Sequence, residues 1–109
     1  MKEIYALILH QTGSNEEFAA RIPRLMIWLR ELHAKGHLVA CGGGGFSNDT
    51  GGGLTLITAD TPEEAEALAA GTPMNEIGYT EIMLWDCYYG NLQHLENRAK
   101  LEQQQPNLA

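Results

Sequence analysis

The sequence predicts an α+β protein with a ferredoxin-like βαββαβ fold, in which an antiparallel sheet ordered 4-1-3-2 carries both helices on one face. Three observations predict this fold. Four short apolar runs are typical of strands, two segments begin with helix-start signals, and a glycine-rich stretch over residues 41–53 separates two similar halves. The stretch contains seven glycines and is expected to be the turn that joins the halves.

The composition limits the class of protein. A chain of 109 residues, 44% of them hydrophobic, fits one globular domain. No apolar run approaches the ~20 residues that span a bilayer, so we expect a cytoplasmic protein without a membrane partner. The formal charge of -7 argues against nucleic acid as a partner. Cys41 and Cys87 lack metal-ligand spacing, so we expect two free thiols and no metal site.

The first half begins with an apolar run over residues 4–10, which predicts a strand buried on both faces. Ser14 and Glu17 have the S-x-x-E spacing of a capping box and predict the start of a helical turn. Proline fits the first turn of a helix, so we expect the main helix to restart near Pro23. Gly36 is the expected end of that helix.

The second half repeats this order. Residues 37–41 and 54–59 are the expected second and third strands, on either side of the glycine stretch. Thr61 is a predicted N-cap followed by proline, and the second helix is expected to end at Gly71. Residues 79–85 are the expected last strand.

The domain is therefore expected to cover residues 1–90. Residues 91–109 are interpreted as a C-terminal extension, because leucines recur there at roughly helical spacing before a polar end. We expect a short docked helix and a frayed terminus in this extension.

The first strand also predicts a partner. A sheet covered on one face should alternate apolar and polar side chains, whereas this strand is apolar at both parities. Another copy of the sheet is the simplest cover for the second face, so we expect a homodimer. The two alternating sets are Tyr5, Leu7 and Leu9 on one side, and Ile4, Ala6 and Ile8 on the other.

Three residues are candidate catalytic groups. If the aliphatic set faces the helices, His10 and Asp86 emerge together on that side, at the ends of neighbouring strands. A carboxylate beside an imidazole raises its pKa and fixes its tautomer, which is a general acid/base arrangement. Asp49 in the glycine stretch is an alternative partner for His10. The competing interpretation is that His10 is a solvated residue at a strand end.

Three further residues are candidate ligand contacts. The glycine stretch is interpreted as a mobile lid that carries Phe46 and Asp49 over the pocket. Trp28 belongs to the apolar stripe of the first helix and is expected in the core or against a ligand. Glu81 is expected on the partner-facing side, where a carboxylate needs a partner, either in a ligand or in the dimer.

Three segments resemble the YCII-related family, and the similarity covers roughly residues 2–85. They are GHLVACG at residues 36–42, ADTPEEA at residues 59–65 and GYTEIMLW at residues 78–85. The resemblance implies a ferredoxin-like dimer that forms an α+β barrel, with a pocket between the sheet and the helices.

At one position the sequence differs from the pattern of the family that it resembles. Members of the family often carry an R-x-x-H-L pattern, whose histidine pairs with an aspartate as a catalytic dyad. Here Arg24 stands at the position of that histidine, and an arginine cannot act as a base near neutral pH. Arg24 is expected either to bind an anionic substrate or to be a solvated helix residue. The family's aspartate-proline step is replaced by Thr72-Pro73.

Three functions follow as hypotheses. The first is an acid/base enzyme of the lyase or hydrolase type that needs no cofactor and acts on a small metabolite. The second is a non-catalytic dimer that binds a small ligand or acts as a regulatory module. The third is an interaction module that docks through its C-terminal segment. A phosphate cradle is disfavoured, because the glycines lead into a strand and not into a helix.

Overall fold

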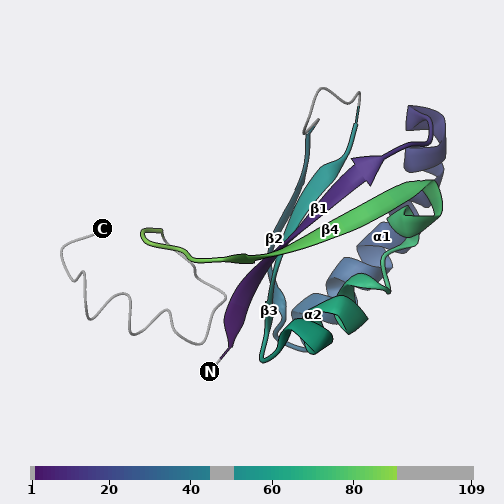
Figure 1. Cartoon of the computed structure of the whole chain (residues 1–109). Helices are drawn as coiled ribbons and strands as arrows, with labels where there is room; N and C mark the ends of the chain where they lie inside the picture. Colours follow the sequence, from purple (N-terminus) through teal and green to yellow (C-terminus); the bar gives the residue numbers. More distant parts are fainter. Residues whose placement is uncertain (1, 45–50, 91–109) are drawn as a thin grey trace.

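The computed structural model describes residues 2–44 and 51–90. The sheet order is β2-β3-β1-β4, which is the predicted order 4-1-3-2, so the predicted fold class is confirmed. All neighbouring strands are antiparallel. The elements are β1 (Glu3–Gln11), α1 (Asn15–Ala34), β2 (Leu38–Gly43), β3 (Gly53–Ala59), α2 (Pro62–Ala69), a 3-10 helix η1 (Pro73–Ile77) and β4 (Gly78–Trp85) (Figure 1).

Helix α1 has the predicted capping box. The Glu17 amide donates to the Ser14 hydroxyl at 3.1 Å, and the Ser14 amide donates to the Glu17 carboxylate at 3.1 Å. The predicted restart at Pro23 is wrong, because α1 continues through this residue. Pro23 lies on the exposed side of the helix, where water can satisfy the carbonyl of Ala19 that the proline leaves without a donor. The helix stops before Gly36, whose φ of 79° suits glycine.

Both helices pack on the same face of the sheet (Figure 1). Ile57 at the centre of β3 is 0% exposed, and burial of such a side chain contributes about 2 kcal/mol. The main core cluster also contains Tyr5, Leu7, Trp28, Leu29, Leu32, Ala59, Ala65 and Ala69.

The helices therefore cover the face of β1 that carries Tyr5 and Leu7, and the expectation that the aliphatic set faces them is wrong. Because both sets are apolar, alternation along β1 alone did not specify which set meets the helices. The opposite face, called the open face below, carries the other residues of β1 and their partners on β4. Its members on β1 and β4 are Ile4, Ala6, Ile8, His10, Tyr79, Glu81, Met83 and Trp85.

Candidate functional site: an apolar cavity between helix and sheet

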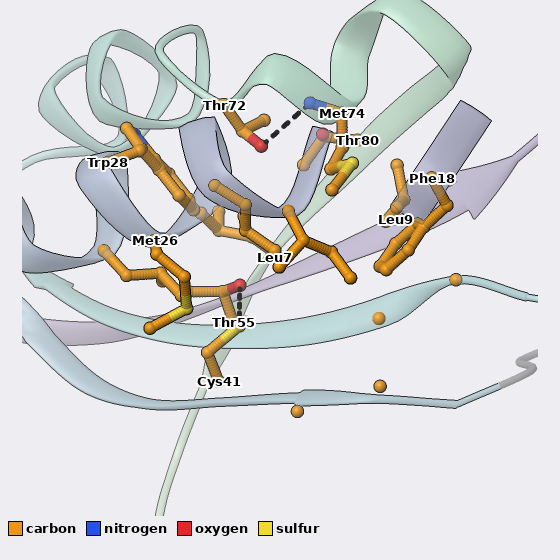
Figure 2. A pocket seen from close by; sticks show the side chains of 17 residues that line it. Leu7, Leu9, Phe18, Met26, Trp28, Cys41, Thr55, Thr72, Met74 and Thr80 are labelled. Carbon is orange, nitrogen blue, oxygen red and sulfur yellow. Dashed lines mark hydrogen bonds between the residues drawn. The ribbon is translucent and has the colours of Figure 1, made fainter. Parts of the chain in front are cut away.

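A cavity of about 280 Å³ lies between α1 and the helix-covered face of the sheet (Figure 2). Leu7, Leu9 and Met74 form its buried inner wall. Met26 on α1 and Cys41 on β2 are exposed and face the same space. The remaining lining residues are Phe18, Ile22, Leu25, Trp28, Leu29, Gly42, Gly43, Gly52, Gly53, Thr55, Thr72 and Thr80.

The cavity exists because two facing positions of the β2-β3 ladder have no side chain. Gly43 pairs with Gly53, and this pair continues the row of Cys41 and Thr55, which points toward the helices. A Cβ atom added at Gly43 would meet no atom within 4 Å. Glycine inside a strand often marks a place where a ligand approaches the backbone closely. The glycine stretch thus contributes a wall to the cavity through Gly43 and Gly53.

The indole of Trp28 is held in place as another wall. Its Nε1 donates to the carbonyl of Leu68 at 3.2 Å, which ties α1 to α2. A Cβ atom at Gly71 would lie 2.9 Å from this Nε1, so glycine is required there unless the indole moves. Trp28 is therefore a core residue, as its position in the apolar stripe indicated, and it also lines the cavity.

Each threonine hydroxyl of the cavity wall makes a hydrogen bond within the protein. The Thr55 hydroxyl donates a hydrogen bond to the Cys41 sulfur at 3.2 Å. The Thr80 hydroxyl donates one to the Asn75 side-chain oxygen at 2.6 Å. The Thr72 hydroxyl accepts from an amide of η1 at 3.2 Å. Among the described lining residues there is no carboxylate, imidazole, amine or guanidinium. The cavity is built to remove apolar surface from water, and these residues supply no acid/base pair.

His10 lies on the open face, on the other side of the sheet from the cavity. Its Nε2 contacts the Glu81 carboxylate at 2.9 Å, and its ring stacks on that of Tyr79 with centroids 4.7 Å apart. The register explains both contacts, because His10 pairs with Tyr79 and is diagonal to Glu81. An ionised carboxylate only accepts hydrogen bonds, so the Nε2–H group is the donor in this contact. Glu81 thus has a partner within its own chain.

The predicted contact between His10 and Asp86 is wrong. Strands β1 and β4 are antiparallel, so the end of one lies beside the start of the other. His10, near the end of β1, pairs with Tyr79 at the start of β4. Asp86 follows Trp85, which pairs with Ile4 at the far end of the ladder. Phe46 and Asp49 lie outside the described residues, so their predicted roles remain predictions.

Arg24 does not line the cavity but belongs to an ion-pair cluster between α1 and η1. Its Nη1 donates to Glu76 at 3.0 Å, and the Nε of Arg21 donates to the same carboxylate at 3.1 Å. The hydrogen bond from Arg24 is the main cause that lowers the pKa of Glu76 from 4.5 to about 2. The same contact raises the pKa of Arg24. Sequence reasoning missed Glu76, because η1 has no periodic pattern that would have placed it beside α1.

The fold and the cavity define a ferredoxin-like α+β protein with an apolar cavity under one helix. The chain belongs to the YCII-related domain family, whose profile matches residues 4–86. Its structure is similar to that of a point mutant of SnoaB from Streptomyces nogalater, which is described as a cofactor-independent oxygenase. The TM-score is 0.51 at 9% identity over 82% of this chain and 95% of that chain, which is a likeness of fold. No curated protein sequence matches the chain.

The described residues contain neither a metal cluster nor a membrane-spanning helix. No group of three His, Cys, Asp or Glu side chains in residues 2–44 and 51–90 is arranged to hold a metal ion. No helix in that part of the chain is long and apolar enough to cross a membrane.

The Glu76 cluster predicts an acid-sensitive contribution to stability. Because the folded pKa of Glu76, about 2, lies below the usual 4.5, the cluster stabilises the fold above pH 4.5 and loses this effect as the pH falls toward 2. Glu76→Gln should therefore lower the urea midpoint of unfolding at pH 7 and have little effect at pH 2. Glu66→Gln is the control, because it removes an exposed carboxylate of α2 that is not part of the cluster. An equal effect of Glu76→Gln at both pH values would contradict the assignment.

Proposed function

We propose that this member of the YCII-related family binds a small, mostly apolar molecule in the cavity between α1 and the glycine positions of β2 and β3, without a cofactor. The observation that carries the proposal is the cavity wall. It combines aromatic and aliphatic side chains with threonine hydroxyls that are already engaged within the protein. A ligand there gains from removal of apolar surface and needs few polar groups of its own.

The volume supports a ligand of about ten heavy atoms or slightly more. An apolar cavity of roughly 150 Å³ takes benzene. The cavity of about 280 Å³ is nearly twice that size, which suits a bicyclic aromatic molecule. Since the wall at Gly43 and Gly53 is bare backbone, a flat ring can lie against it without a clash.

Filling the cavity from Gly43 tests the proposal. The side chain of Gly43→Leu should project into the cavity and weaken binding of 2-naphthamide at least tenfold. Gly42→Leu is the matched control, because Gly42 pairs with Leu54 and points to the open face. Binding is measured by protection of the Cys41 thiol against Ellman's reagent in a Cys87→Ser background. Absence of protection in the parent protein, or equal loss in both leucine variants, would contradict the proposal.

The protein is also proposed to work as a homodimer that covers the open face. Tyr79, Met83 and Trp85 stand there with 59%, 48% and 39% of their surface exposed, which is unfavourable in water. A second copy of the same face is complementary in apolar character, and a two-fold axis lets each sheet cover the other. The hydrogen bond between His10 and Glu81 offsets part of the cost of burying these two groups.

Met83→Lys should convert the dimer to a monomer, because it places an ammonium group in the middle of the interface. Sedimentation velocity over a range of protein concentrations measures the change. Ile27→Lys on α1 is the control, since this exposed isoleucine is not on the open face. A parent protein that sediments as a monomer, or a Met83→Lys variant that remains dimeric, would exclude this interface.

A second candidate function is acid/base catalysis on the open face, of the lyase or hydrolase type. The observation that favours it is the 2.9 Å contact of His10 with Glu81, in which a carboxylate orients an imidazole that is also stacked on Tyr79. The similarity in fold to SnoaB, a cofactor-independent oxygenase, is compatible with chemistry that uses side chains alone. In this case the substrate would bind in the dimer interface and not in the cavity.

His10→Gln separates this candidate from simple binding. If His10 is a general base, hydrolysis of 4-nitrophenyl acetate above the buffer rate should fall about 100-fold. His33→Gln is the control: it makes the same substitution at a histidine of α1 and should leave the rate unaltered. Equal rates in the parent protein and in His10→Gln would remove the catalytic role of His10, while protection of Cys41 by 2-naphthamide would still support the binding function.

A further inference from the structure

We propose that the ligand of the cavity is an amphipathic organic acid, with a flat apolar body inside the cavity and its carboxylate at the mouth beside Arg30. The proposal rests on the binding function above and names the chemical class of the ligand. It depends on where the cavity opens, on the charges at that opening and on the polar groups that remain available there.

The cavity opens along the β2 edge of the sheet. Its inner wall is deeply buried, with Leu7 and Met74 both 3% exposed. The lining residues of α1 on the other side are Ile22 and Met26, which are 42% and 40% exposed. Strand β2 is an edge strand, so no further strand of the described sheet closes the gap between it and α1. A ligand would enter between Met26 and β2 with its last atoms near solvent.

Arg30 follows Met26 by four residues and therefore lies on the same side of α1, one turn of about 5.4 Å further along. Its neighbours at three and four residues along the helix are Met26, Ile27, His33 and Ala34, none of which is a carboxylate. Within the described residues its exposed guanidinium makes no ion pair.

The other two arginines of α1 differ from Arg30 in this respect. Arg21 and Arg24 both contact Glu76 on η1, so each of these guanidinium groups already has a carboxylate partner. Among the described residues, Arg30 is thus a cation without an ion-pair partner, one helical turn from Met26 in the cavity wall, in a chain whose formal charge is -7. A ligand anion is the complementary group, and a guanidinium binds a carboxylate with two parallel hydrogen bonds.

The edge of β2 leaves further backbone donors along the opening of the cavity. An edge strand leaves a row of backbone N–H and C=O groups without a strand partner. At Gly42 and Gly43 no side chain shields this backbone. Inside the cavity, by contrast, the hydroxyls of Thr55 and Thr80 both donate hydrogen bonds to protein atoms. The polar end of a ligand is therefore favoured at the mouth and its apolar end inside.

The experiment compares 2-naphthoate with 2-naphthamide, which have the same shape and differ in charge. Dissociation constants are measured by isothermal titration calorimetry for the parent protein, Arg30→Gln, Gly43→Leu and Lys35→Gln. Lys35→Gln removes the same charge at the end of α1 and is the control for net charge. The parent protein should bind naphthoate about fivefold more tightly than naphthamide. Arg30→Gln should abolish this difference, and Gly43→Leu should weaken both ligands.

Other outcomes distinguish the two proposals. Tighter binding of naphthamide, or a naphthoate preference that survives Arg30→Gln, would overturn the organic-acid inference while leaving the binding function intact. A preference lost equally in Lys35→Gln would also overturn it, because the effect would then come from net charge. Failure of both ligands to bind the parent protein would overturn the binding function itself.

Discussion

The arrangement of the whole molecule depends on the central strand β1, which is apolar on both faces and pairs with β3 and β4 over most of its length. Tyr5 and Leu7 bind the helical layer to one side of the sheet. The opposite side, which is the open face, carries Ile4 and Ala6. A strand of this kind separates two compartments, the helix-covered side with the cavity and the open face with His10 and Glu81. The polar pair of His10 and Glu81 is therefore divided by a sheet from the apolar cavity.

The cavity remains open because contacts to α2 on one side and to η1 on the other fix the position of α1. Toward α2, the Trp28 indole donates to Leu68, and the absence of a side chain at Gly71 leaves room for it. Toward η1, the guanidinium groups of Arg21 and Arg24 share the Glu76 carboxylate. These contacts fix the helix while Gly43 and Gly53 place no side chain beneath it to fill the space. Proteins seldom tolerate unfilled apolar volume, because each lost contact costs dispersion energy. Because fixed neighbours keep this apolar wall accessible at the β2 edge, an occupant that displaces water from it would gain free energy, as the proposed binding function requires.

The sequence predicted the fold because its local signals agreed with one another. The capping box at Ser14, the N-cap at Thr61 and the apolar strands all indicated the same βαββαβ order, which the structure confirms. The site was harder to predict for two physical reasons. A strand apolar at both parities does not specify its buried face, so His10 was assigned to the wrong compartment. The antiparallel direction of β4 then separated Asp86 from His10, whereas Glu81, which was expected to face a ligand or a dimer partner, proved to be the carboxylate in contact.

The replacement at Arg24 is consistent with this division of the molecule. A histidine at that position in α1 would place a titratable group near η1, whereas Arg24 is always charged and is engaged by Glu76. The cluster stabilises the docking of η1, which carries Met74 into the cavity wall. Where the resemblance implies a histidine, this chain thus has an arginine in an ion pair with Glu76. If this chain performs acid/base chemistry, the imidazole of His10 on the open face is the group whose surroundings suit it. That chemistry would differ in position from the family pattern, although the fold is the same.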